Sequence, residues 1–147
     1  MFTVYHYDRR SRGRSTDTQP YAVEREVDDL AALIAEAGES AYVYAFSSGG
    51  LLALHAATAG LPIPRMALLE PPIELNEDRS AERLFTTELS NLLAAGQPER
   101  ATEFYLTGIG VPEEIVASMR GSVSWSAAES VAPHLRLRQS DQRGELI

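Results

Sequence analysis

Apolar and polar residues alternate in blocks along the first half of the chain, and the blocks predict strands and helices in turn. Residues 2–7 (FTVYHY) are aromatic and β-branched, which indicates a strand, and the polar residues 8–13 end it. Between residues 20 and 37, apolar side chains recur at steps of four, three and four: Val23, Val27, Leu30 and Ile34. This spacing places them on one stripe of a helix, which Gly38 is expected to end.

Further apolar runs continue the alternation. Residues 41–46 (AYVYAF) are apolar without a clean period of two, as in a parallel strand covered on both faces. Residues 51–59 form a small-residue helical pattern, and residues 65–69 (RMALL) indicate a strand that Glu70-Pro71-Pro72 stops. Strands and helices that alternate with short connections predict an α/β fold with about three parallel strands.

The second half of the chain is helical in pattern. The predicted helices are residues 77–95, 98–107, 112–120 and 124–131. Glycine and proline residues separate them. In the first of them the apolar face comes from Leu84, Leu89, Leu92 and Leu93. We therefore expect an α/β core over residues 1–73, a helical segment over 74–134 and a polar, frayed tail over 135–147.

Composition narrows the classes of partner and site. A net charge of −8 argues against nucleic acid or an anionic membrane as the main partner. The chain has no cysteine, which excludes disulfides, thiolate metal sites and cysteine nucleophiles. No phosphate-binding glycine loop or metal-ligand spacing occurs, so no cofactor or metal is expected. Without a membrane-length apolar run or a signal-peptide pattern, the expected location is cytoplasmic.

The clearest chemical signal is a serine at a turn between a strand and a helix. Ala45-Phe46-Ser47-Ser48-Gly49 follows the pattern G-x-S-x-G with alanine in place of the first glycine. In such a nucleophile elbow, small residues let the strand and helix approach, and the helix N-terminus offers free N–H groups to an oxyanion. The alternative is that Ser47 or Ser48 only caps the helix.

The surrounding segments resemble those of the α/β-hydrolase superfamily. Residues 8–15 (DRRSRGRS) are similar to the D-x-R-G-x-G-x-S turn after that family's strand four, with Ser11 in place of a glycine. Residues 41–58 resemble its strand five, elbow and helix C, and residues 66–72 (MALLEPP) its strand six. Over residues 2–134 the resemblance implies a partial α/β-hydrolase fold with a helical cap, Ser47 as nucleophile and the Ser48 backbone N–H as an oxyanion donor.

The same resemblance implies a truncated member. The family's strands one to three and its second oxyanion donor would precede this chain, and strands seven and eight, with the usual acid and histidine, would follow it. Because strand three lies between strands four and five in the family, residues 2–7 and 41–46 would flank an empty slot. Unpaired strand edges favour association, so a homodimer could form through them.

A triad in the required order is available from Ser47, Glu70 and His134. In the alternative interpretation, Glu70 is a surface carboxylate and His134 has no catalytic role. His6 and His55 are expected to be structural. The arginines at residues 9, 10, 12 and 14 are expected to lie in a solvated loop with an Asp–Arg contact.

The sequence thus predicts a serine hydrolase that attacks small hydrophobic ester- or amide-type substrates through an acyl-enzyme on Ser47. Low or no activity is expected of this chain. The alternatives are a complete small hydrolase using Glu70 and His134, and a binding module or pseudo-hydrolase whose cap is a lid over an apolar pocket.

Overall fold

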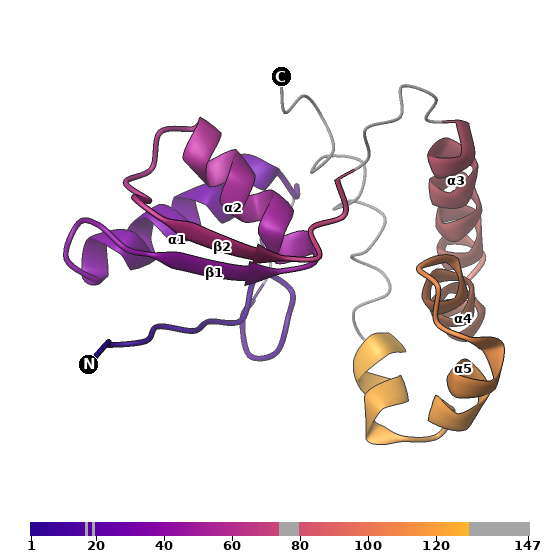
Figure 1. Cartoon of the computed structure of the whole chain (residues 1–147). Helices are drawn as coiled ribbons and strands as arrows, with labels where there is room; N and C mark the ends of the chain where they lie inside the picture. Colours follow the sequence, from indigo (N-terminus) through magenta and orange to yellow (C-terminus); the bar gives the residue numbers. More distant parts are fainter. Residues whose placement is uncertain (17, 19, 74–79, 130–147) are drawn as a thin grey trace. The chain divides into compact units, whose positions relative to one another are not determined.

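The computed structural model describes residues 1–16, 18, 20–73 and 80–129 (Figure 1). These residues fall into two compact units, an α/β unit up to residue 73 and a helical unit over residues 80–129. His134 and the polar tail of residues 135–147 lie outside the described residues.

The first helix, α1 (Val23–Glu36), forms where the apolar stripe predicts it. Val23 and Ile34 of the stripe are buried. Gly38 ends the helix as expected, with a φ of 107° that allows the Glu39 N–H to donate to the Ile34 carbonyl at 3.1 Å.

The sheet consists of two parallel strands in the described residues. β1 (Val43–Phe46) pairs with β2 (Met66–Leu69) in a register that runs from Val43↔Met66 to Phe46↔Leu69. Helix α2 (Ser48–Thr58) connects them. The α/β class is confirmed, but the predicted third strand is absent, because residues 2–7 are not hydrogen-bonded into the sheet (Figure 1). A strand exists only where a neighbour pairs its backbone groups, and no described segment occupies that place.

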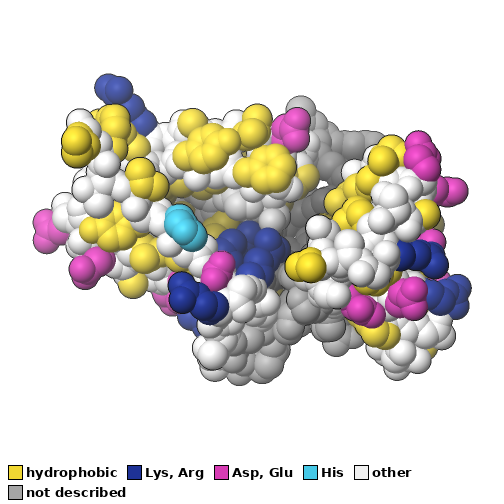
Figure 2. All heavy atoms as spheres, turned by 90° about the horizontal axis from the view of Figure 1, so that it is seen from below, with side chains coloured by type: hydrophobic (Ala, Val, Ile, Leu, Met, Phe, Trp, Pro, Cys, Tyr) yellow, Lys and Arg dark blue, Asp and Glu magenta, His cyan; other side chains and the backbone are white. Residues whose placement is uncertain are grey.

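Both helices of this unit lie on one side of the sheet (Figure 1). The buried residues Leu51, Leu52 and Ala53 of α2 form much of the core there. Alternate strand residues on the other side are open: Tyr44 is 71% exposed and Phe46 57%. The prediction that both faces of this strand are covered is therefore wrong for the described residues. Hydrophobic side chains accordingly gather on the surface of this unit, at left in Figure 2.

The helical unit contains α3 (Ser80–Ala94), α4 (Pro98–Gly108) and α5 (Glu113–Met119), followed by helical residues 123–129. Leu89, Leu92 and Ala101 form its buried cluster. The rings of Phe85 and Phe104 stack beside that cluster with centroids 4.9 Å apart.

All four predicted helical segments are present in this unit, but Leu84 is exposed rather than on the apolar face. None of the helices formed by described residues is long and apolar enough to cross a bilayer.

Candidate active site

Ser47 occupies the turn between β1 and α2 in a backbone conformation that side chains rarely adopt. Its φ is 51° and its ψ −128°, and such strain in a residue other than glycine is concentrated at functional sites. Its N–H donates to the Leu69 carbonyl at 2.9 Å, and its carbonyl accepts from the Gly50 N–H at 2.8 Å. The Ser47 side chain makes no capping hydrogen bond to α2. The capping interpretation requires the Ser47 hydroxyl to cap the start of α2, and the hydroxyl does not do so.

Of the two glycines after Ser47, only one is required by a close approach of another segment. A Cβ added to Gly49 would lie 3.9 Å from the Cβ of Ala45, an ordinary contact, which explains why alanine is acceptable at the first position of the pattern. A Cβ added to Gly50 would lie 2.9 Å from the Cβ of Pro71. The glycine with the tighter steric requirement is therefore Gly50, which lies outside the G-x-S-x-G pattern.

Glu70 lies beside Ser47 at the carboxyl end of the sheet. Each is the residue directly after its strand, and the paired residues before them are Phe46 and Leu69. Glu70 is exposed and has a φ of 49°. The contact of Pro71 with Gly50 holds the chain after β2 against the start of α2. The structure thus brings together the candidate nucleophile and acid of the sequence prediction, whereas the candidate base, His134, lies outside the described residues.

The turn at residues 8–15 is held by its motif residues. The Asp8 carboxylate accepts the Arg14 N–H at 3.0 Å, and the Ser15 hydroxyl donates to the Asp8 carbonyl at 2.6 Å. Gly13 has a φ of 54°, and a Cβ there would lie 2.3 Å from the Asp8 carboxyl carbon. Ser11, which stands where the motif has glycine, also has a positive φ, of 60°.

The prediction of a solvated arginine loop is wrong for Arg9 and Arg10. The Arg10 guanidinium forms two hydrogen bonds with the Asp29 carboxylate of α1, at 2.6 and 2.8 Å. The Arg9 side chain is more deeply buried than that of Arg10 and forms an ion pair with Glu26, whose side chain is 1% exposed. Glu26 is a residue that the sequence reasoning missed, although it lies three positions after Val23 and so on the buried side of α1.

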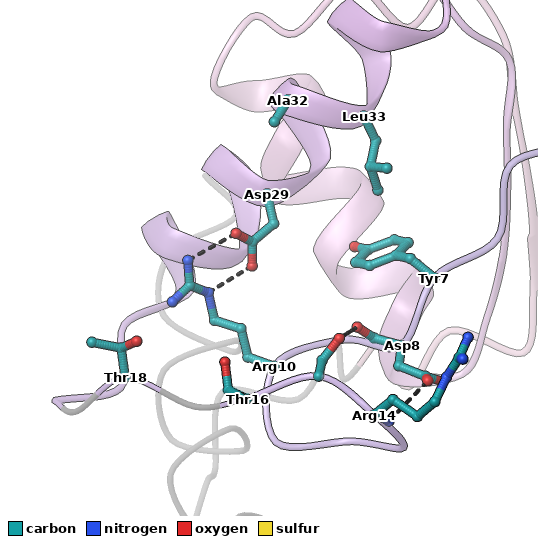
Figure 3. A pocket seen from close by; sticks show the side chains of 10 residues that line it. Tyr7, Asp8, Arg10, Arg14, Thr16, Thr18, Asp29, Ala32 and Leu33 are labelled. Atoms are coloured by element: carbon teal, nitrogen blue, oxygen red, sulfur yellow. Dashed lines mark hydrogen bonds and ion pairs between the residues drawn. The ribbon is translucent and has the colours of Figure 1, made fainter.

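An open pocket of about 660 Å³ lies between the turn and α1 (Figure 3). Tyr7, Asp8 and Arg10 line one side of it, and Asp29 and Leu33 the other. The pair of Arg10 and Asp29 is satisfied within the wall of the pocket, and Ser47 is not part of its lining. This pocket is therefore separate from the candidate nucleophile.

The two remaining histidines were expected to be structural, and His55 fits that expectation, whereas His6 does not because it lies outside any strand. His55 is half-buried on α2, two turns beyond Ser47, and His6 is exposed in the unpaired segment. No three His, Asp or Glu side chains of the described residues are grouped so that they could hold a metal ion.

Comparison with known proteins agrees with this geometry. The alpha/beta hydrolase family matches residues 2–144 of the chain. The crystal structure of an alpha/beta hydrolase from Sphaerobacter thermophilus is similar with a TM-score of 0.80 and 45% sequence identity. The match covers 94% of this chain and 54% of that one, so the chain spans little more than half of the solved relative. No curated protein matches. The strand–turn–helix arrangement around Ser47 and these matches together show that the chain belongs to the alpha/beta hydrolase family.

Proposed function

We propose that Ser47 is the nucleophile of a serine hydrolase that acts on small hydrophobic ester- or amide-type substrates. The observation that carries the proposal is the backbone of Ser47, with a φ of 51° directly between β1 and α2 and no capping bond from its hydroxyl. A turn that served only to start a helix would use the serine oxygen as its cap and would not require a strained φ.

The reaction follows from the position of Ser47 at the start of a helix. Its Oγ attacks the substrate carbonyl carbon, and the hydroxyl proton passes to a base, for which His134 is the candidate. The negative charge that develops on the carbonyl oxygen is stabilised by the Ser48 N–H, since the first N–H groups of a helix have no intrahelical acceptor. The leaving group departs with a proton, and water then releases the acyl group from Ser47.

Glu70 is the candidate acid in this proposal. It follows β2 as Ser47 follows β1, which puts a carboxylate on the adjacent strand at the same edge of the sheet. A carboxylate in such a position orients a protonated base and stabilises its charge.

Labelling with a fluorophosphonate probe tests the nucleophile without a known substrate. The wild-type chain should acquire one phosphonyl group, located at Ser47 by peptide mass spectrometry, and Ser47→Ala should acquire none. Ser118→Ala removes a serine whose hydroxyl binds a backbone carbonyl of α5, and it should label as the wild type does. No labelling of the wild type after many hours, or labelling that persists in Ser47→Ala, would overturn the proposal.

A further inference from the structure

Arg9 connects three segments that are separate in the sequence. It lies in the turn of residues 8–15, its Nε donates to Glu26 Oε2 of α1 at 2.5 Å, and its Nη1 donates to Ser48 Oγ at 3.3 Å. The side chain of Arg9 is only 10% exposed. A guanidinium has donors in a rigid planar fork, so one arginine can fix two acceptors in a defined relative orientation.

The contact with Ser48 is what distinguishes Arg9 from its neighbour. Arg10 and Asp29 already join the turn to α1 through two hydrogen bonds. A second ion pair between the same turn and helix is not needed for that purpose, and burial of such a pair contributes little to stability because both charges lose water. Arg9 also extends from this pair of segments to the start of α2.

Ser48 is the first residue of α2 and directly follows Ser47. The Ser47 side chain does not cap this helix, so the first turn lacks the usual restraint at its N-cap. A hydrogen bond to the Ser48 hydroxyl supplies a restraint one residue later. Because Glu26 neutralises Arg9, the arginine acts here through its directed hydrogen bond rather than through a net charge.

The orientation of Arg9 is also not the one that would satisfy every donor. Its Nη2 is buried and has no hydrogen-bond partner in the described part of the chain. An unpaired buried donor destabilises a fold, which indicates that Glu26 and Ser48 together determine the direction of the guanidinium.

We propose that Arg9 is a positioning residue. Its hydrogen bond to Ser48 holds the first turn of α2 and thereby fixes the direction of the Ser48 N–H. This N–H is the oxyanion donor of the proposed function, so the consequence for catalysis rests on that function.

The test measures hydrogen exchange of the amides in residues 43–52 by mass spectrometry, with urea denaturation to follow global stability. Ser48→Ala removes the acceptor, and Arg9→Lys keeps the charge beside Glu26 but loses the second arm of the fork. Each should raise exchange in this segment by about tenfold beyond any global change, which corresponds to about 1.4 kcal/mol. The double variant should show no more than either single one, because both remove the same hydrogen bond.

Two matched variants separate positioning from general support of the fold. Ser48→Thr retains a hydroxyl and should restore the wild-type protection. Arg10→Lys weakens the neighbouring pair with Asp29 and should leave the exchange of residues 43–52 unchanged. Fluorophosphonate labelling should slow in Ser48→Ala and recover in Ser48→Thr.

Additive effects of Ser48→Ala and Arg9→Lys, or unchanged exchange in both, would overturn the positioning role. If Arg9→Lys does not fold, the comparison of Ser48→Ala with Ser48→Thr decides alone. Exchange requires no turnover, so absence of labelling in the wild type refutes Ser47 as nucleophile and leaves the exchange result intact. Labelling with unchanged exchange in the variants refutes only the role of Arg9.

Discussion

Ser47 and Glu70 leave neighbouring parallel strands at the same level of the sheet, and both have a left-handed φ, 51° and 49°. The Ser47 N–H donates to the carbonyl of Leu69, the residue before Glu70, which ties the two turns together. Each such conformation costs about 1–3 kcal/mol in a residue other than glycine. Two of them side by side are a reason to infer a functional role for this edge of the sheet.

Replacement of Glu70 by glutamine tests whether its carboxylate takes part. Glu70→Gln keeps the shape of the side chain and removes its charge, so we expect fluorophosphonate labelling of Ser47 to slow by about tenfold or more. A time course of probe incorporation measures the rate. Glu39→Gln is the matched control, because Glu39 is also exposed with a positive φ, of 69°, but follows α1. Equal rates for Glu70→Gln and the wild type would make Glu70 a surface carboxylate.

Alanine at Gly50 should destabilise the elbow, whereas alanine at Gly49 should not. A Cβ at Gly50 would lie 2.9 Å from the Pro71 Cβ and 3.4 Å from its Cα, and relief of that overlap is expected to cost about 1–3 kcal/mol. At Gly49 the new methyl group would have only an ordinary contact, so the higher helix propensity of alanine should leave stability equal or raise it by up to about 1 kcal/mol. Urea denaturation followed by circular dichroism measures both. Equal loss in the two variants would contradict the close approach of Pro71 to Gly50.

In the turn before α1, Ser11→Gly should stabilise the protein and Gly13→Ala should destabilise it. Glycine relieves the φ of 60° at Ser11, for an expected gain of about 1 kcal/mol. A methyl group at position 13 would overlap the Asp8 carboxylate, and alanine there would have to adopt the φ of 54°. We expect the free energy of unfolding to fall by about 2 kcal/mol or more. The thermal unfolding midpoints should therefore shift in opposite directions. A fall in the midpoint of Ser11→Gly would show that Ser11 contributes more through its side chain than the backbone strain costs.

Local patterns predicted much of the fold, because the interactions behind them are local. The stripe of α1 and its Gly38 stop depend on residues within a few turns of one another, and so does the change from strand to helix at Ser47. Residues 2–7 have strand composition as well, but strand formation requires a partner from elsewhere in the chain, and composition carries no information on whether one is present.

The contacts that shape the candidate site are long-range, and for that reason they were missed. Glu26 lies among the polar positions of α1 and was not singled out from the sequence, and its partner Arg9 was expected to lie in a solvated loop. The requirement for glycine at Gly50 comes from Pro71, which approaches it only after β2 has paired with β1. Such contacts follow from the topology, which spacing along the chain does not specify.

The open face of the sheet predicts self-association of this chain. Tyr44, Phe46 and Leu69 are respectively 71%, 57% and 47% exposed on the side of the sheet away from α1 and α2. Contiguous exposed apolar side chains and an unpaired strand edge both favour association. We therefore propose that the homodimer suggested by the strand edges forms through this face. Sedimentation velocity should show an apparent mass that rises with concentration above the monomer value of 16.1 kDa.

A charge in the centre of that face should prevent the association. Tyr44→Lys would have to bury an ammonium group against the apolar side chains of the second copy, and desolvation of an unpaired charge is strongly unfavourable. We expect this variant to sediment as a monomer at every concentration tested. Leu84→Lys is the control, because Leu84 is 73% exposed but lies on α3 of the helical unit, and it should associate as the wild type does. Loss of association in Leu84→Lys but not in Tyr44→Lys would place the contact on the helical unit, and a wild-type chain that is always monomeric would remove the sheet face as an interface between copies.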